Sequence, residues 1–185
     1  NIIGLCAGSY IVTVTDANAC TAIDTGVVNQ PTALTTAASV TDASCNGTCD
    51  GSIDLTPTGG TGAYTFSWTN SAITEDIASL CAGIYGVTVS DNNDCSTIAV
   101  DTVTQPAALT TSTSGVNATC NGGSDGSATA TPSGGVPAYT YLWDDPGSQT
   151  NATANALGAG TWNVTVTDAN GCTGTHSYVV NEPDP

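Results

Sequence analysis

Cysteines are the residues of this chain whose number and spacing could do chemistry. The 185 residues include eight cysteines but only one histidine and no lysine or arginine. The cysteines are Cys6, Cys20, Cys45, Cys49, Cys81, Cys95, Cys120 and Cys172. Thiols in this number either form disulfide bonds in an oxidising compartment or bind a metal such as zinc.

The chain repeats itself, and the repeat relates the cysteines to one another. Residues 5–35 are echoed at 80–110 and again at 157–183. Cysteines at matching positions are 75 residues apart between the first two copies and 77 apart between the second and third. A fixed period of this size is typical of an array of similar modules.

Comparison of the copies predicts how the cysteines pair. The last copy keeps Cys120 and Cys172 but carries Ser124 and Gly158 at the two remaining cysteine positions. Two cysteines that are lost together are interpreted as partners of each other. The predicted disulfides are therefore Cys45–Cys95, Cys49–Cys81 and Cys120–Cys172. Modules this small bury only about 60% of their unfolded surface, so such bonds would stabilise them.

A zinc site is the alternative for these cysteines. Cys45 and Cys49 have C-x3-C spacing, which zinc sites use, but the last copy keeps only one of the pair. Disulfides are therefore favoured, and they indicate an extracellular compartment. Cys6 and Cys20 match Cys81 and Cys95, so their partners are expected upstream of residue 1.

Three short turns carry carboxylate and amide oxygens in alternate positions. The pairs are Asp16 with Asn18, Asp91 with Asn93, and Asp168 with Asn170. Alternating oxygen ligands suit Ca²⁺, which is the one cofactor that the sequence suggests. Asp and Asn also favour tight turns by bonding to their own backbone, and this is the preferred interpretation.

Residues for catalysis are nearly absent. Without lysine or arginine, a Schiff base and an arginine clamp are excluded, and any Ser-His-Asp triad would depend on His176. Asp24, Thr25 and Gly26 spell the aspartic-protease triplet, but that chemistry needs two facing aspartates and the triplet does not recur in the next copy. We predict that the chain is not an enzyme and that His176 lies on a surface or edge strand.

Short strands must position these groups. Alternation such as Tyr85, Val87 and Val89 on one face against small polar residues on the other is typical of half-buried strands. In the middle copy, strands are expected at 34–41, 51–56, 63–69, 73–80, 84–90 and 97–104. Six or seven strands in about 75 residues predict an all-β fold of tandem immunoglobulin-like antiparallel β-sandwich modules with intramodular disulfides.

Proline dipeptides set the expected boundaries between modules. They occur at Gln30-Pro31, Gln105-Pro106 and, with a substitution, Glu182-Pro183. Proline stiffens the chain and cannot donate to a β-ladder, so it suits a short joint. The predicted domains are 1–31, the C-terminal part of a truncated module, and the complete modules 32–106 and 107–185.

Charge restricts the partners. The formal net charge is −16, from 16 acidic residues and no basic side chain. Nucleic acid is excluded as a partner because phosphate binding needs a basic surface, and an anionic membrane is disfavoured for the same reason. No stretch approaches the roughly 18 apolar residues of a membrane span. The expected partners are neighbouring repeats of the same chain or a homopolymer.

Two tryptophans recur at one position of the repeat, beside a Gly-Gly turn. Trp68 and Trp143 are interpreted as core residues of the modules. The alternative is that they contact surface glycans, which would make the chain an array of carbohydrate-binding modules. Loss of glycan binding on their replacement by alanine, without loss of folding, would favour that alternative.

Three motifs recur in order and carry a resemblance to a known family. They are C-N-G-x-x-D-G-S, T-P-x-G-G-x-x-x-Y-T-x-x-W and L-x-A-G-x-Y/W-x-V-T-V-x-D-x-N-x-C, at 45–52, 56–68 and 80–95 and again at 120–127, 131–143 and 157–172. The chain resembles the SprB-type repeat of Bacteroidota cell-surface gliding adhesins. The resemblance implies secretion, by the type IX route, and a role in adhesion or in surface filaments. The additional pair Cys49 and Cys81 and the absence of basic residues depart from the pattern.

Glycosylation motifs are also present. The sequence Asp101-Thr102-Val103 matches an O-glycosylation pattern associated with Bacteroidota, with Thr102 as the acceptor. N-x-S/T sequons begin at Asn46, Asn117, Asn151 and Asn163. The sequence therefore predicts a structural or adhesive glycoprotein segment of an extracellular fibre.

Overall fold

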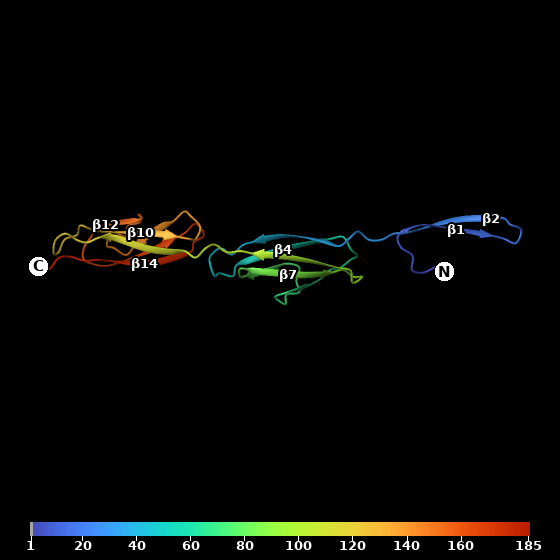
Figure 1. Cartoon of the computed structure of the whole chain (residues 1–185), viewed down its shortest axis with the longest axis horizontal. Coiled ribbons are helices and arrows are strands. Elements are labelled where there is room, and N and C mark those ends of the chain that lie inside the picture. The colour runs from blue at the N-terminus through green and yellow to red at the C-terminus, as the bar shows by residue number, and fades with distance from the viewer. Residues whose placement is uncertain (1) are drawn as a thin grey trace. The chain divides into compact units, whose positions relative to one another are not determined.

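The regular structure of residues 2–185 consists of β-strands alone. The computed structural model describes residues 2–185, and Figure 1 shows the strands along the chain. The strands are β1 (Gly8–Thr15), β2 (Thr21–Val28), β3 (Thr35–Thr41), β4 (Gly51–Thr58), β5 (Thr65–Trp68), β6 (Ile77–Leu80), β7 (Gly83–Ser90), β8 (Ser96–Val103), β9 (Thr110–Val116), β10 (Gly126–Ser133), β11 (Thr140–Trp143), β12 (Thr153–Leu157), β13 (Gly160–Thr167) and β14 (Thr173–Val180). Within the described residues, no helix is long and apolar enough to cross a membrane.

Contacts divide the chain into two compact units. The first comprises the residues up to Ala37 together with Leu55–Glu75 and Val87–Ala99. The second comprises Ala38–Asp54, Asp76–Gly86 and Val100–Pro185. The predicted module boundary at residue 106 falls inside the second unit. The predicted domain limits therefore describe repeats of sequence and stay predictions.

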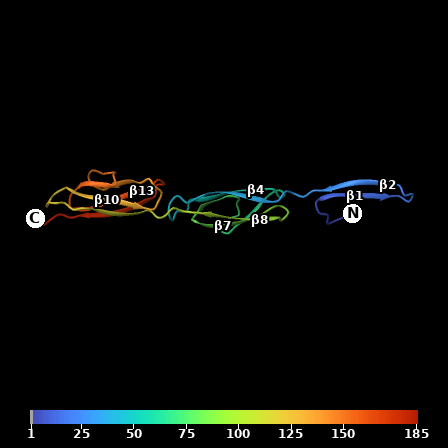
Figure 2. The ribbon, with the colours of Figure 1, turned by 45° about the horizontal axis from the view of Figure 1, so that its top comes forward.

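Strands β9–β14 form a two-sheet sandwich that lies wholly within the second unit (Figures 1 and 2). The sheet orders are β12-β10-β9 and β11-β13-β14, and neighbouring strands are antiparallel. In the β13–β14 hairpin, Gly160 lies opposite Val180 at one end and Thr167 lies opposite Thr173 at the other. The hairpin thus runs the length of its sheet and carries a turn at one end.

The core of this sandwich combines small and large side chains. One sheet contributes alanines, and the other contributes Trp143, Val164 and Val166, each at most 1% exposed. The buried cluster is Ala118, Ala128, Ala130, Trp143, Ala154, Leu157, Val164, Val166 and Val180. The indole N–H of Trp143 donates to the carbonyl of Asn151 at 3.1 Å, which satisfies its one polar atom inside the core.

The strands of residues 32–106 follow the same plan. Their sheets have the orders β3-β4-β6 and β5-β7-β8. Ile53 and Leu55 of β4 and Ile77 of β6 are buried where the later repeat has alanines. The predicted all-β fold of immunoglobulin-like sandwich modules is therefore confirmed.

The observed strands of this repeat agree with those predicted, apart from one start. The strand expected from Ile73 begins at Ile77. The preceding residues form a loop, in which Ser71 donates to the carbonyl of Trp68 and Trp68 donates to the carbonyl of Ala72. Ile73 is 77% exposed, so its apolar side chain does not mark a strand.

Strands β1 and β2 form a separate two-stranded hairpin. Their register runs from Gly8 opposite Val28 to Thr15 opposite Thr21. This matches the β13–β14 hairpin, where eight pairs likewise run from one end to the turn. Residues 16–20 therefore form the turn that corresponds to residues 168–172.

Candidate functional site at the repeat junction

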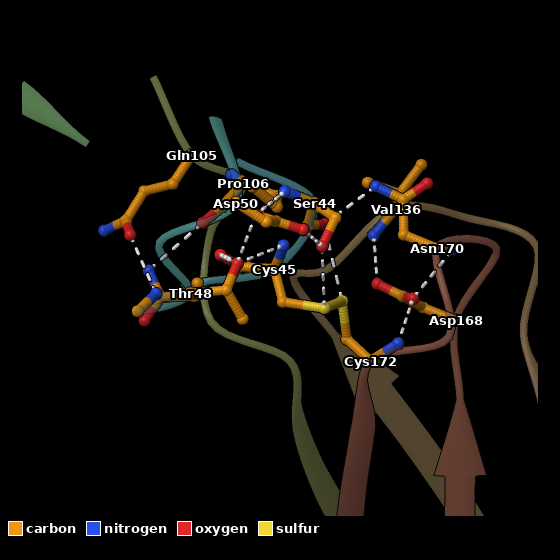
Figure 3. Close-up of a disulfide and its surroundings, with 12 residues drawn as sticks. Ser44, Cys45, Thr48, Asp50, Gln105, Pro106, Val136, Asp168, Asn170 and Cys172 are labelled. Atoms are coloured by element: carbon orange, nitrogen blue, oxygen red, sulfur yellow. Dashed lines mark hydrogen bonds between the residues drawn. A yellow bond between two sulfur atoms is a disulfide. The ribbon is translucent and has the colours of Figure 1, made fainter. Parts of the chain in front are cut away.

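A disulfide joins two consecutive repeats. Cys45 is bonded to Cys172, with an S–S distance of 1.99 Å and a Cα–Cα distance of 5.8 Å (Figure 3). Cys45 belongs to residues 44–50, which precede β4 and are called the Cys-Asn-Gly loop below. Cys172 closes the turn at residues 168–172 between β13 and β14, called the Asp-x-Asn-x-Cys turn. The bond spans 127 residues of sequence.

Asp50 holds the Cys-Asn-Gly loop together. Its Oδ1 accepts the backbone N–H of Ser44 at 3.0 Å and the hydroxyl of Thr48 at 2.9 Å, and its Oδ2 accepts the hydroxyl of Ser44. Donation by the Ser44 hydroxyl, then by the Ser44 N–H and Thr48, lowers the pKa of Asp50 to about 2. At neutral pH the loop is therefore organised around a carboxylate anion.

The linker proline dipeptide also contacts this loop. The backbone N–H of Gly47 donates to Oε1 of Gln105 at 2.8 Å, and the side-chain amide of Asn46 donates to the carbonyl of Pro106 at 3.1 Å (Figure 3). The glutamine of the Gln-Pro dipeptide thus fixes the loop, in addition to the stiffness that the proline gives the joint.

Asp168 organises the opposing turn in the same manner. Oδ1 accepts the N–H groups of Asn170 and Cys172, both at 2.9 Å, and Oδ2 accepts the N–H of Val136 at 2.8 Å. The carboxylate is only 5% exposed. Donation from Val136, and then from Cys172 and Asn170, outweighs the effect of burial and lowers the pKa of Asp168.

The turn at Gly134 and Gly135, called the Gly-Gly turn of the last repeat, contacts the linker, which comprises residues 105–109. The N–H of Gly135 donates to the carbonyl of Ala107 at 2.9 Å. Gly134 has a φ of +76°, and a Cβ there would lie 2.1 Å from the carbonyl oxygen of Ala108. Only glycine allows this close approach of two backbones. The linker is therefore seated on the repeat that follows it.

A polar contact accompanies the covalent bond. The side-chain amide of Asn170 donates to the carbonyl of Ser44 at 2.8 Å (Figure 3). Beside it lies a pocket of about 370 Å³, lined by Asn46 of the loop, by Leu109 of the linker and by Gly171 of the turn, among other residues. In the Asp-x-Asn-x-Cys turn, Asp168 thus stabilises the turn, Asn170 donates a hydrogen bond to the Cys-Asn-Gly loop, and Cys172 forms the disulfide with that loop.

The predicted pairs Cys45–Cys95 and Cys120–Cys172 are wrong. Cys120 lies at the Val180 end of the β13–β14 hairpin, where its neighbour Gly122 donates to Glu182 at 2.6 Å. Cys172 lies at the opposite end, after an eight-residue strand that is about 24 Å long. A disulfide requires Cα atoms within about 7 Å, so the length of the sandwich forbids this pair.

The other predicted pair is present. Cys49 is bonded to Cys81, a sequence separation of 32 residues. Because Cys45 and Cys49 are oxidised in different bonds, no C-x3-C zinc pair remains. The cysteines without a bond among the described residues are Cys6, Cys20, Cys95 and Cys120, all exposed.

The carboxylates predicted as calcium ligands accept backbone N–H groups. Oδ1 of Asp16 accepts from Asn18 and Cys20, both at 2.8 Å. Asp91 bonds in the same way to Asn93 and Cys95. The preferred turn interpretation therefore accounts for these aspartates, and calcium at these residues stays a prediction.

The two tryptophans belong to the core. Trp68 is 4% exposed and Trp143 is 1% exposed. The indole N–H of Trp68 donates to the carbonyl of Thr74 at 2.9 Å. The alternative in which these residues contact a surface glycan is thereby corrected, because neither ring presents a face to solvent.

The predicted modification sites lie at the surface. Thr102 is exposed on β8, between partly buried Asp101 and buried Val103. The sequon residues Asn46, Asn117, Asn151 and Asn163 are exposed as well. His176 is exposed on β14, as predicted, with Nδ1 2.9 Å from the Thr113 hydroxyl. Glycosylation at these positions stays a prediction.

Sequence reasoning missed several residues of the junction. It considered Asp50 only as a lesser calcium candidate and Gln105 only as part of a module boundary, and it assigned no role to the Ser44 carbonyl. Their common signal is the recurrence of C-N-G-x-x-D in both complete repeats, each followed some 60 residues later by Gln-Pro or Glu-Pro. Such recurrence marks a structural requirement but does not identify the partner.

Comparison with known families decides the nature of the repeat. The family model of the SprB repeat matches residues 37–73 and 112–148. Two stretches of the chain are thus similar to the SprB repeat. Each match begins in the first strand of a module, β3 or β9, and extends through the Cys-Asn-Gly loop and the Gly-Gly turn. The resemblance predicted from the motifs is thus confirmed, and it favours a repeat segment of the cell-surface adhesin type.

Other comparisons add little to the SprB repeat match. No curated protein matches the sequence of the chain. Among solved structures, a structure described for Dscam isoform specificity matches at 15% identity over 95% of this chain and 54% of that one, with a TM-score of 0.37. A C-terminal intimin fragment bound to its Tir domain matches at 14% identity over 93% and 57%, with a TM-score of 0.38. The chain thus spans about half the length of these proteins, and TM-scores this low carry no argument about function.

Proposed function

We propose that this chain is a force-transmitting, non-enzymatic segment of a secreted Bacteroidota surface adhesin that extends as a filament. The observation that carries the proposal is the Cys45–Cys172 disulfide, because it links one repeat covalently to the next. A chain of domains joined only by linkers can be stretched by unfolding each domain. A bond across the junction limits how far the chain can be extended.

Two further properties support an extracellular role. Disulfides persist in oxidising compartments and are rare in the cytosol of most organisms. The net charge of −16 keeps the chains soluble and mutually repelling. The finer parts of the proposal, namely secretion and filament formation, rest on the family resemblance together with these properties.

Single-molecule stretching tests the mechanical part of the proposal. The Cys45–Cys172 bond closes off 127 residues of separation, and each extended residue adds roughly 3.5 Å. In the double variant Cys45→Ser with Cys172→Ser, the Cys49–Cys81 bond still withholds 32 residues. The difference corresponds to about 33 nm of additional contour length. We expect the oxidised wild type to lack this extension.

The control is the double variant Cys49→Ser with Cys81→Ser. It keeps the Cys45–Cys172 bond, so we expect its total extension to equal that of the oxidised wild type. If the wild type releases the same length as the Cys45 and Cys172 variant under oxidising conditions, the chain does not transmit force in the proposed way.

Glycosylation of Thr102 is part of the proposal. Thr102 is exposed in the middle of an Asp-Thr-Val sequence on β8, so a glycosyltransferase can reach its hydroxyl. Intact mass measurement of the native protein and of Thr102→Ala should differ by a glycan as well as by the side chain. Equal masses, after correction for the substitution, would remove this element and leave the mechanical role unaffected.

A further inference from the structure

Cys120 lies in a second Cys-Asn-Gly loop, at residues 119–125, with the same internal bonds as the first. The backbone N–H of Thr119 donates to Oδ1 of Asp125 at 3.0 Å, and its hydroxyl donates to Oδ2. These bonds reproduce those between Ser44 and Asp50. Donation from Thr119 lowers the pKa of Asp125, as Ser44 does for Asp50.

The linker side of this second loop is also in place. Gly122 donates its N–H to Oε2 of Glu182, and the amide of Asn121 donates to the carbonyl of Pro183 at 3.2 Å. Gln105 and Pro106 make the equivalent contacts at the first loop. Cys120 is exposed and unbonded, although its loop is already folded as the loop of Cys45 is.

Cys20 and Cys95 occupy Asp-x-Asn-x-Cys turns. In each turn, one carboxylate oxygen accepts the N–H groups two and four residues later, at 2.8 to 2.9 Å. The turn of Cys172 has the same two bonds. Both Cys20 and Cys95 are exposed and unbonded.

The linker seat beside Cys95 is built as it is beside Cys172. The N–H of Gly60 donates to the carbonyl of Thr32 at 2.9 Å, and Asp91 lies against this Gly-Gly turn. A pocket of about 200 Å³ there is lined by Pro31, Leu34 and Cys95, among other residues. The thiol of Cys95 therefore lies beside linker residues 30–34, as the sulfur of Cys172 lies beside linker residues Ala108 and Leu109.

From these matches we infer that Cys120 forms an intermolecular disulfide with the Asp-x-Asn-x-Cys turn of a second copy of this chain. The bonded pair Cys45–Cys172 shows that the two local structures fit each other, with the sulfur atoms at bonding distance. Cys120 offers one half of that pair, and Cys20 and Cys95 offer the other half. Copies would therefore join in one direction, each through its own Cys120.

The reaction is thiol–disulfide exchange with a small disulfide such as oxidised glutathione. The thiolate of one cysteine attacks glutathione disulfide and releases one reduced glutathione. The thiolate of the second protein then attacks the mixed disulfide and releases another. Two protein thiols become one protein disulfide, and one glutathione disulfide becomes two glutathiones, which balances atoms and electrons.

The test is oxidation of the purified chain in a glutathione redox buffer, followed by non-reducing electrophoresis. We expect a ladder at multiples of 18.2 kDa that grows with protein concentration and collapses with reductant. Peptide mapping must use a protease that cuts at acidic or aromatic residues, because the chain has no lysine or arginine. Cys120 should be found linked to Cys20 or Cys95.

Three variants make the outcome decisive. Cys120→Ser should remove the ladder, and so should the combined Cys20→Ser and Cys95→Ser variant. Cys6→Ser is the matched control, because Cys6 lies in neither kind of loop, and it should leave the ladder intact. Cys120 linked to another Cys120, to Cys6, or to a cysteine of its own chain would overturn the inference.

The inference rests on the proposed function only in assuming that copies of this chain meet one another in an oxidising compartment. The two fail separately. Loss of the ladder would leave the stretching result of a single chain unchanged, and a wild type without the mechanical limit could still form the ladder. Reaction of Cys120 with neither turn at millimolar concentration would reject the inference alone.

Discussion

The side-chain amide of Asn170 donates a hydrogen bond to the backbone carbonyl of Ser44, at 2.8 Å and across 126 residues of sequence. Asn170 stands two residues before the cysteine that bonds Cys45. One turn therefore supplies both a directional polar contact and a covalent bond to the preceding repeat. The polar contact and the disulfide thus hold the same turn against the same loop.

A second intramodular disulfide can be installed in the last repeat. Ser124 and Gly158 stand where the middle repeat has Cys49 and Cys81, and a Cβ on Gly158 would lie 3.7 Å from Oγ of Ser124. We expect the double variant Ser124→Cys with Gly158→Cys to form a bond and to stabilise the repeat by about 3–4 kcal/mol, by the loop-entropy estimate. Denaturant titration of the oxidised cysteine variant against an oxidised variant that lacks both new cysteines measures the gain.

The control is the oxidised variant Ser124→Ala with Gly158→Ala, since it keeps the native disulfides but cannot form the new bond. Equal midpoints of the two oxidised variants, with the new bond verified by mass, would show that the bond does not stabilise this repeat.

Gly134 should not tolerate a side chain. It combines a φ of +76° with a backbone oxygen 2.1 Å from the point that a Cβ would occupy, so Gly134→Ala should destabilise the repeat by about 2–3 kcal/mol. Two other glycines separate the effect of the positive φ from the effect of the backbone clash. Gly171 has a φ of +84° and open space, so Gly171→Ala should cost about 1 kcal/mol, and Gly158→Ala should cost less than about 0.5 kcal/mol. Thermal unfolding of the three variants orders them, and equal effects would contradict the clash.

Acid should loosen the Cys-Asn-Gly loop. The pKa of Asp50 is lowered to about 2 from an ordinary value of 3.8. A depressed carboxyl pKa stabilises the folded loop fully above about pH 4, and this contribution is lost as the pH falls towards 2. Carboxyl NMR should show Asp50 titrating near pH 2. Protection of the Ser44 amide against exchange, relative to an unfolded peptide at the same pH, should fall over that range.

The variant Asp50→Asn tests whether the charge is the cause. It keeps the size of the side chain but cannot titrate, so protection of the Ser44 amide should already be low at neutral pH and should vary little between pH 4 and pH 2. A wild-type pH profile retained in this variant would assign the effect to another group.

Calcium should not be required for the fold. Both oxygens of Asp168 already accept N–H donors, so the turn has internal partners for its charge. We expect the midpoint of thermal unfolding to be the same in millimolar Ca²⁺ and in chelator. A lower midpoint in chelator for the wild type, with no such difference in Asp168→Asn, would establish calcium binding at this turn.

Sequence alone was sufficient for the strands and the family, because both depend on local pattern. The alternation around Val87 and Val89 predicts a strand whatever lies beside it. Of the three predicted cysteine pairs, only one is present in the structure. Joint loss at Ser124 and Gly158 identified the pair Cys49–Cys81 correctly. The other two cysteine positions recur for a different reason, since Cys45 and Cys172 belong to a loop and a turn that face each other across a repeat junction.

The junction could not be predicted because it depends on which end of the sandwich each loop occupies. Pattern shows that Cys120 and Cys172 belong to one module, but the strand lengths and the hairpin register place them at opposite ends. The roles of Asp50 and Gln105 likewise require the loop and the linker to be seen together. Only their recurrence was visible in the sequence.

The two disulfides form nested rings, since Cys49 and Cys81 both lie between Cys45 and Cys172 in the chain. Cleavage of any one peptide bond between Cys45 and Cys172 therefore leaves both fragments covalently attached. A cut between Cys49 and Cys81 is spanned by two bonds. Proteases that need lysine or arginine find no site in the chain at all. A chain with these nested disulfides stays covalently continuous after a single cleavage that would sever an ordinary polypeptide.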